Sequence, residues 1–190
     1  HKKDFSKDYI EDRFVSNPEV LYQNLDIDIT VPKNLKYVED AWNTAAVEMV
    51  PNLKLFTGMF DVLEFLKNDN YEIFILTARD ARSTNMTLEN LGIKEFFSGV
   101  NGAENNPVKP HPKALDNLLA GKPREKSFMV GDSDVDILVA KNYKIKSIGA
   151  RWCPFVKKRG LHGEKQDPTY FADSTLDCLS IINDHLKSIN

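Results

Sequence analysis

The segment Ser127-Phe-Met-Val-Gly-Asp-Ser-Asp-Val-Asp136 decides the fold, because a short apolar run ends directly in a dense group of carboxylates. Runs of the same kind recur at residues 73–76, 96–100 and 145–148. Helical spacing of apolar residues fills the intervals between these runs. Short apolar runs separated by helices are typical of parallel strands that are buried on both faces. The sequence therefore predicts an α/β fold with a parallel sheet.

The first third of the chain has a different pattern. Its apolar residues fall at helical spacing, and Pro18, Pro32 and Pro51 interrupt that spacing, which favours three or four short helices. Later helices are predicted over residues 60–66, 82–91, 112–120, 134–142 and 175–188. We therefore predict an all-helical segment over residues 1–57 and an α/β segment over residues 58–190.

Composition excludes several classes of function. The 190 residues have a net charge of -3, so no basic excess supports nucleic-acid binding. No apolar run approaches the roughly 20 residues that span a bilayer, and no signal peptide is recognisable, so no membrane partner is expected. The two cysteines are expected as thiols in a reducing compartment, with one disulfide as the alternative, and the protein is expected to be cytoplasmic. The sequence does not indicate an oligomeric state.

Polar residues follow three of the predicted strands, where parallel sheets bind their ligands. In chain order these residues are Thr77, Ala78, Arg79, Lys109, Asp132, Asp134 and Asp136. A hydroxyl, an ammonium group and a cluster of carboxylates are the groups that magnesium-assisted phosphoryl transfer requires. The strand ends therefore predict a site for Mg2+ and a phosphate group.

Each of these groups also has an ordinary structural interpretation. The aspartates can cap the helix that begins near Asp134, Thr77 can be a strand-end hydroxyl without a role, and Lys109 can be a solvated loop lysine. A cap accounts for one carboxylate but leaves other like charges close together, which is costly without a cation. The coincidence of all three groups at strand ends favours the magnesium and phosphate site.

Three motifs resemble those of the haloacid dehalogenase (HAD) superfamily of phosphatases and phosphomutases. Ile-Leu-Thr77 is similar to motif II, Lys109-Pro-His-Pro to motif III and Gly131-Asp-Ser-Asp-Val-Asp136 to motif IV, in the same order. The segment Lys54-Leu-Phe-Thr-Gly resembles the junction after a helical cap in the phosphoglycolate phosphatase-like and β-phosphoglucomutase-like branches. The resemblance implies a Rossmann-like core with a small all-helical cap.

The resemblance also implies a role for each matched residue. Thr77, with Ala78 and Arg79, would bind the transferring phosphoryl group, and Lys109 would neutralise its charge. Asp132 would ligate Mg2+, whereas Asp136 would either support the metal through water or hold Lys109 in place. The implied activity is that of a Mg2+-dependent phosphatase that forms an aspartyl-phosphate and acts on a small phosphorylated metabolite. A phosphomutase and an inactive binding or regulatory domain are the alternatives.

The family's nucleophile motif, an apolar strand followed by Asp-x-Asp-Gly-Thr, has no close match before the predicted cap. The nearest sequence lies at residues 26–30, where Asp26 would be the nucleophile and Asp28 the acid/base. That assignment requires a buried strand over residues 20–25, which two polar side chains disfavour, so we expect a cap helix there. The core sheet then lacks a central strand. Its neighbours would keep unpaired backbone groups unless a further segment or another chain fills the gap.

Overall fold

The computed structural model describes residues 6, 9–10, 13, 18–105, 107–154, 156 and 167–189. The chain divides into two compact units, His1–Ala46 and Val47–Asn190. This division falls before the 57/58 boundary expected from the sequence. The difference from the expected boundary arises near Val50. This residue is buried, and its carbonyl accepts a 3.0 Å hydrogen bond from the Asn90 side chain. The 3-10 turn η1 (Val50–Asn52) therefore contacts α5 (Ala81–Asn90) of the α/β unit, and the boundary at 57/58 stays a prediction.

The first unit is helical where it is described. It contains α2 (Pro18–Asn24) and most of α3 (Pro32–Met49). Both helices begin at a proline, whose fixed φ suits the first helical position and whose missing N–H is not needed there. Buried Leu21 and Leu25 show the apolar face that the helical spacing predicted. The strand that the Asp26 assignment requires is therefore replaced by α2, as the two polar residues indicated.

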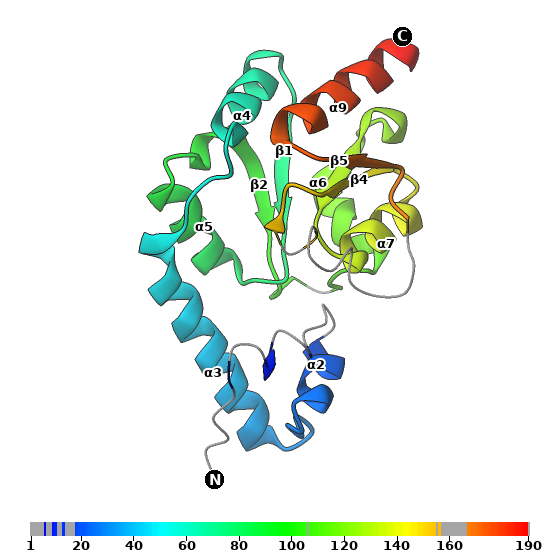
Figure 1. The fold of residues 1–190 in the computed structure, drawn as a ribbon. Helices are drawn as coiled ribbons and strands as arrows, with labels where there is room; N and C mark the ends of the chain where they lie inside the picture. The colour runs from blue at the N-terminus through cyan, green and yellow to red at the C-terminus, as the bar shows by residue number, and fades with distance from the viewer. Residues whose placement is uncertain are drawn as a thin grey trace. The chain divides into compact units, whose positions relative to one another are not determined.

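The described residues of the second unit form five short parallel strands. Their bounds are β1 (Ile73–Leu76), β2 (Phe97–Asn101), β3 (Phe128–Gly131), β4 (Lys146–Ala150) and β5 (Tyr170–Ala172). They form two sheets with the orders β1-β2 and β3-β4-β5, and all their pairings are parallel. The predicted α/β fold class is confirmed. In Figure 1 the strands of the two sheets run in clearly different directions.

Helices connect and cover these strands. The longer ones are α4 (Met59–Asn68), α5 (Ala81–Asn90), α7 (Asp134–Tyr143) and α9 (Thr175–Ile189). The helix predicted over residues 112–120 begins instead with a 3-10 turn, η3 (Pro112–Leu115), followed by one α-helical turn, α6 (Asp116–Leu119). No helix in the described part of the chain is long and apolar enough to cross a membrane.

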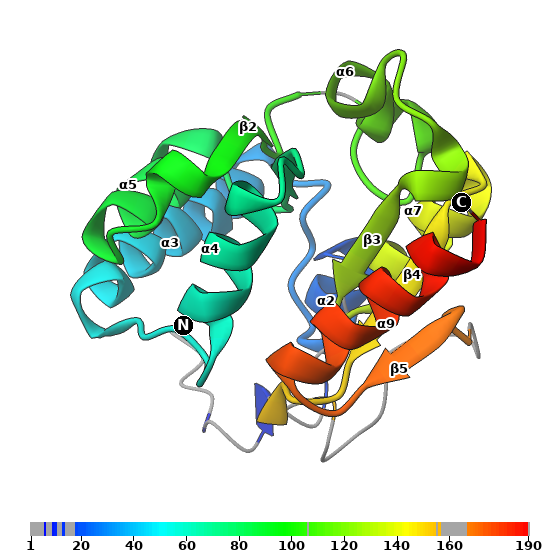
Figure 2. The same ribbon diagram turned by 90° about the horizontal axis from the view of Figure 1, so that it is seen from above.

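The β3-β4-β5 sheet has a helix on each face. Figures 1 and 2 show α7 on one side of these strands and α9 on the other. Ile148 of β4 is fully buried and packs with Ala172, Cys178 and Ile182, whereas Val139 of α7 belongs to a second cluster. A third cluster, formed around Leu63, Leu88, Ile93 and Phe96, packs against the β1-β2 sheet.

A long-range hydrogen bond joins the starts of α4 and α9. The buried Thr175 hydroxyl donates to the Thr57 carbonyl over 2.8 Å. Gly58 between them has φ of 76°, and a Cβ atom there would lie 2.9 Å from the Thr175 hydroxyl oxygen. Only glycine meets both requirements without strain.

Candidate functional site

The turn after β1 holds the predicted phosphate-binding residues. The Thr77 N–H donates to the Asn101 carbonyl over 3.0 Å, which continues the pairing of β1 with β2 by one residue. The Thr77 hydroxyl oxygen accepts from the Arg79 N–H over 3.1 Å. A hydroxyl that accepts one bond still has its own proton to donate. Thr77 is thus held in place at the strand end with a donor for an anion, and Ala78 beside it is exposed.

Asp80 fixes the end of this turn by capping α5. Its carboxylate accepts a 2.8 Å bond from the Ser83 N–H and a 2.5 Å bond from the Ser83 hydroxyl. These hydrogen bonds lower the pKa of the Asp80 carboxyl below its usual value. Glu104, which the sequence analysis did not single out, accepts from the Ala81 N–H over 3.1 Å. Asp80 and Glu104 therefore both stabilise the turn that follows β1.

The end of β3 contains a buried ion pair. The Lys109 Nζ lies 2.5 Å from Asp136 Oδ1, and the two side chains are 11% and 6% exposed. Asp136 Oδ2 accepts from the Ser133 N–H and the Ser133 hydroxyl, over 3.1 and 2.6 Å. Both oxygens of Asp136 are thus engaged. The structure thus brings Lys109 and Asp136 together. Asp136 also takes part in capping α7, because its carboxylate accepts the bond from the Ser133 N–H.

Gly131 makes this arrangement sterically feasible. A Cβ atom at Gly131 would lie 2.4 Å from the Asp136 side chain, which is closer than real Cβ contacts allow. The Lys109 loop is held by α7, because Asn142 donates its side-chain N–H to the Pro110 carbonyl over 3.0 Å. The His111 ring nitrogen accepts from the Lys113 N–H over 3.2 Å, so His111 stabilises the loop. The ammonium group of Lys109 is therefore fixed relative to β3.

Asp132 is the exposed carboxylate of this segment. Its Oδ2 lies 3.4 Å from the Cys153 Sγ, a neighbour that the sequence did not reveal because it comes from the loop after β4. Asp134 Oδ1 is buried and has no hydrogen-bond partner among the described residues. Within the same residues, no three His, Cys, Asp or Glu side chains are grouped closely enough to hold a metal ion. A divalent ion at Asp132 therefore needs further oxygen ligands.

Asp26 and Asp28 lie in the first unit, in the loop after α2. Asp26 has φ of 55°, and Asp28 accepts bonds from the Thr30 hydroxyl and N–H over 2.6 and 3.0 Å. The Thr30 hydroxyl and N–H lower the pKa of the Asp28 carboxyl below its usual value. These contacts form a local turn that stabilises the connection to α3.

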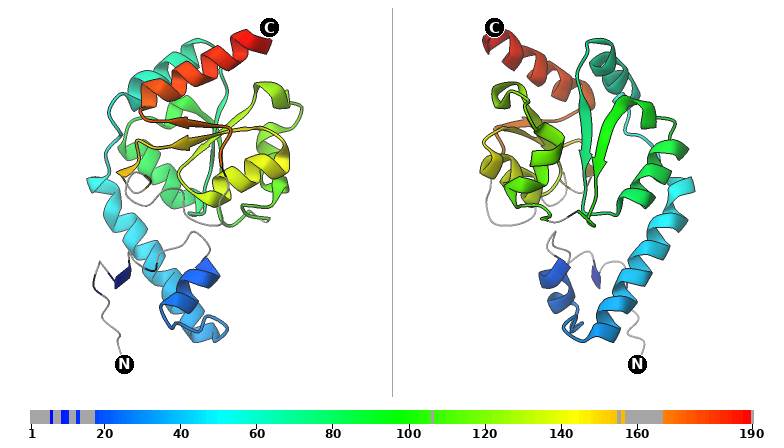
Figure 3. Two further views of the ribbon diagram at one scale, coloured as in Figure 1. Left: turned by 45° about the vertical axis from the view of Figure 1, so that its right-hand side comes forward. Right: turned by 180° about the vertical axis from the view of Figure 1, so that it is seen from behind.

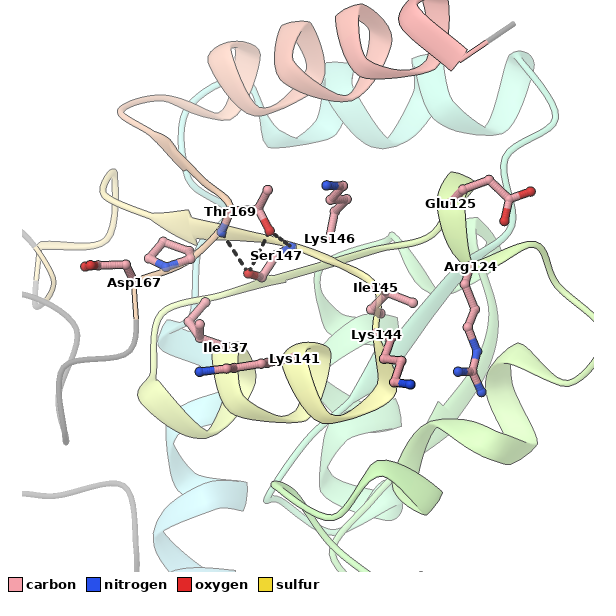
Figure 4. Close-up of a pocket in the computed structure, with 11 residues that line it drawn as sticks. Arg124, Glu125, Ile137, Lys141, Lys144, Ile145, Lys146, Ser147, Asp167 and Thr169 are labelled. Carbon is pink, nitrogen blue, oxygen red and sulfur yellow. Dashed lines mark hydrogen bonds between the residues drawn. The ribbon is translucent and has the colours of Figure 1, made fainter.

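A cavity of about 860 Å³ lies elsewhere, at the amino end of β4. Figure 4 shows that its basic side chains, among them Lys141, Lys144 and Lys146, point in different directions. Its two hydroxyl residues bond each other's backbone, since the Ser147 N–H donates to the Thr169 hydroxyl and the Thr169 N–H donates to the Ser147 hydroxyl. The cavity therefore lacks converging groups for an anion, and the strand ends remain the candidate site.

Comparison with known proteins identifies the family of this chain. Residues 1–150 match the family model of haloacid dehalogenase-like hydrolases. The chain belongs to this family. The HAD motifs identified at Thr77, Lys109 and Asp132 all lie within the matched residues.

The HAD chain has curated relatives named pyrophosphatase PpaX. The protein from Bacillus mycoides is 30% identical over 67% of this chain and 60% of its own length. The protein from Anoxybacillus flavithermus is 29% identical over 68% of this chain and 60% of its own length. The chain thus spans about three fifths of the length of these relatives.

Solved structures show the same HAD fold. A predicted phosphoglycolate phosphatase from Haemophilus somnus 129pt has a TM-score of 0.70 at 23% identity, over 93% of this chain and 82% of its own. A haloacid dehalogenase-like family hydrolase from Streptococcus pneumoniae has a TM-score of 0.70 at 19% identity, over 94% and 82%. At these identities the likeness supports the fold alone.

Proposed function

We propose that this HAD protein is a Mg2+-dependent phosphatase that acts on a small phosphorylated metabolite, with a cap over residues 1–57 and a core over residues 58–190. The proposal rests most on the buried pair of Lys109 and Asp136 at the end of β3. Burying a charged lysine side chain costs free energy unless an oppositely charged group pairs with it, so a buried lysine at a strand end favours a functional role. An ammonium group held at a strand end provides a fixed charge for a phosphoryl group.

Thr77 and the turn after it would bind the same phosphoryl group. The Thr77 hydroxyl would donate one hydrogen bond, and the backbone N–H groups of Ala78 and Arg79 lie in the turn that follows. Asp136 would act as a positioning residue, because Lys109 and Ser133 engage both its oxygens. Of the two roles considered for Asp136, the geometry supports holding Lys109.

Mg2+ would bind at Asp132. Carboxylate oxygen is a preferred ligand of this ion, and Asp132 is the exposed acid at the end of β3. Bound Mg2+ would neutralise charge that develops on the transferred group. Asp132 alone does not complete the coordination, so water, the substrate and a further carboxylate would supply the other ligands.

The reaction would pass through an aspartyl-phosphate. An aspartate attacks the phosphorus, the bond to the leaving oxygen breaks, and water then releases inorganic phosphate. Asp26 as nucleophile with Asp28 as acid/base is one assignment, and Asp26→Asn tests it through phosphate release. An unchanged rate would remove Asp26 from the reaction.

A phosphomutase would use the same groups. An inactive binding domain is supported by a specific observation, namely that Asp26 and Asp28 lie in a local turn after α2 and not at the end of a strand. Cys153 and Cys178 are not joined by a disulfide, which is consistent with a cytoplasmic location as part of the proposal.

The decisive experiment measures phosphate release and phosphate binding together. Pyrophosphate is the first substrate to test, because the curated relatives are named pyrophosphatases, and para-nitrophenyl phosphate represents monoesters. We expect turnover that requires Mg2+ and falls about 100-fold or more in Lys109→Ala. Lys113→Ala, an exposed lysine of the same loop, is the matched control and should keep the activity. Mg2+-dependent phosphate binding without turnover would indicate the inactive binding domain.

A further inference from the structure

Asn101 is a buried polar residue at the end of β2. Its side chain is 7% exposed, whereas the apolar Val100 beside it is only half-buried. The Asn101 Nδ2 donates to the Ala114 carbonyl over 2.7 Å, while its Oδ1 is buried without a hydrogen-bond partner among the described residues. A buried amide that leaves an acceptor unpaired costs free energy. Packing alone therefore does not explain an asparagine at this position.

The backbone of Asn101 holds Thr77. Leu76, the last residue of β1, lies opposite Asn101 in the parallel pairing of β1 with β2. The next N–H along β1, that of Thr77, donates to the Asn101 carbonyl over 3.0 Å. Seen from behind in Figure 3, the two strands run side by side. The main chain of Asn101 thus fixes the point at which Thr77 leaves the sheet.

The side chain of Asn101 holds the loop that carries Lys109. Its acceptor, the carbonyl of buried Ala114, belongs to η3, which begins three residues after Lys109. The Ala114 N–H donates to the His111 carbonyl over 3.0 Å, and the His111 N–H donates to the Val108 carbonyl over 3.0 Å. These bonds connect the acceptor of Asn101 to the backbone on both sides of Lys109.

The same loop is also attached to the β3-β4-β5 sheet and its helix. Lys109 pairs with Asp136 of α7, and Leu115, next to Ala114, packs with Val139 and Ala140 of that helix. Residues 114 and 115 of η3 therefore contact β2 and α7, respectively. Asn101 supplies the contact that relates this loop to the strand end of Thr77.

We propose that Asn101 is a positioning residue, whose backbone carbonyl and side-chain amide together set the spacing between the Thr77 hydroxyl and the Lys109 ammonium. The inference rests on the proposed function, in which these two groups bind one phosphoryl group. Both can meet that group only at a fixed separation, because a displacement of about 1 Å can lower a rate by roughly 100-fold. Leucine, with the same branched shape, would leave no unpaired oxygen at this position, but it could not bond the loop.

Hydrogen exchange of Asn101→Leu tests the contact without relying on turnover. The substitution removes the amide donor and keeps the backbone carbonyl that Thr77 uses. By NMR, the amides of His111 and Ala114 should exchange about tenfold faster or more, because the loop opens more often. The amides of β4 should not change, since that strand does not contact Asn101 in its pairings.

A double-mutant cycle with Lys109 separates positioning from a structural role. Phosphate release from pyrophosphate or para-nitrophenyl phosphate is measured with Mg2+ as kcat/KM per folded protein. Asn101→Leu should lower this rate about tenfold or more in the parent chain. In a Lys109→Ala background it should lower the rate by less than about twofold, because the group on which it acts is gone. A residue that only stabilises the fold would cost the same factor in both backgrounds.

Asn90→Leu is the matched control. The Asn90 side chain also donates an amide bond to a backbone carbonyl, that of Val50, over 3.0 Å, at the last residue of α5. The same chemical change there should alter neither the exchange of the Lys109 loop nor the rate. If Asn101→Leu does not fold, Asn101→Ser takes its place, since its shorter side chain cannot span the same distance to Ala114.

Each outcome decides one part of the proposal. Unchanged exchange at His111 and Ala114 would show that Asn101 does not hold the loop. An equal loss of rate with and without Lys109 would reject the positioning role. If the parent chain binds phosphate without turnover, the same cycle is measured on the dissociation constant of inorganic phosphate by calorimetry. A parent chain with neither turnover nor phosphate binding would reject the proposed function and the role that rests on it, while the exchange result would still stand for the contact.

Discussion

β4 and β3 are neighbours in one sheet, yet their surroundings differ. β4 lies between β3 and β5, and its Ile148 is fully buried against Cys178 and Ile182 of α9. Among the strands that the structure describes, β3 has a partner on one side only, and its Val130 is 39% exposed. β3 is the more apolar of the two in sequence, since β4 contains Lys146 and Ser147. The difference shows that an apolar run predicts a strand, while its neighbours determine how far the strand is buried.

The largest effect is expected at the buried pair that anchors the end of β3. Asp136→Ala leaves the Lys109 ammonium buried without its partner, which should lower the free energy of unfolding by about 3–5 kcal/mol. Urea unfolding measures this loss. The double variant Asp136→Ala with Lys109→Met should recover much of it, since no uncompensated charge remains. A double variant as unstable as the single one would contradict the pairing.

Truncating one side chain in each strand should affect β4 more than β3. Ile148→Ala in β4 should cost about 2–5 kcal/mol of unfolding free energy, because it leaves a cavity in a closed cluster. Val130→Ala in β3 removes a side chain that is already partly in solvent and should cost less than about 1 kcal/mol. Thermal unfolding of both variants measures the contrast. Equal losses would show that β3 is as well covered as β4.

The end of β1 depends on the Asp80 cap. Asp80→Ala should cost about 0.5–2 kcal/mol at neutral pH, because the first turn of α5 loses an acceptor. The pKa of Asp80 is lowered in the folded protein, so this stabilisation is present above the unfolded pKa and is lost as the pH falls through the folded one. The difference between variant and parent should therefore shrink below about pH 4. Asp184→Ala, an exposed acid on α9, is the control.

The smallest effect concerns the two thiols. Burial raises the pKa of Cys178, which packs against Ile148, to about 12, so it should remain a thiol and resist alkylation near neutral pH. Cys153, in the loop after β4, is only half-buried. Mass spectrometry after brief iodoacetamide treatment should find one modified cysteine, Cys153. Rapid modification of Cys178 would show that the cluster around β4 opens readily.

The sequence predicted most of the second unit because its strands are dense apolar runs. Four of the five strands and the helices α4, α5, α7 and α9 lie close to their expected positions. β5 was missed because three residues are too few for a periodic signal. Pro112 begins a 3-10 turn, so the helix predicted over residues 112–120 is interrupted.

Fewer contacts of the candidate site could be predicted from the sequence. The contact of Lys109 with Asp136 joins distant parts of the chain, and only the family resemblance suggested it. The roles of Gly131 and Cys153 depend on packing across loops, which no local pattern encodes. The sheet gap, in contrast, followed from counting strands against the family pattern.

The hydrogen bond from Thr175 to Thr57 also has a consequence for folding during synthesis. The two residues are separated by 118 positions. At about 5–20 residues per second, a ribosome makes Thr175 roughly 6–24 s after Thr57. During that interval the start of α4 has no partner from α9, and Gly58 has nothing to hold its left-handed turn. The contact between α4 and α9 can therefore form only after residue 175 has been made, which pulse-proteolysis of stalled ribosome complexes of increasing length can test.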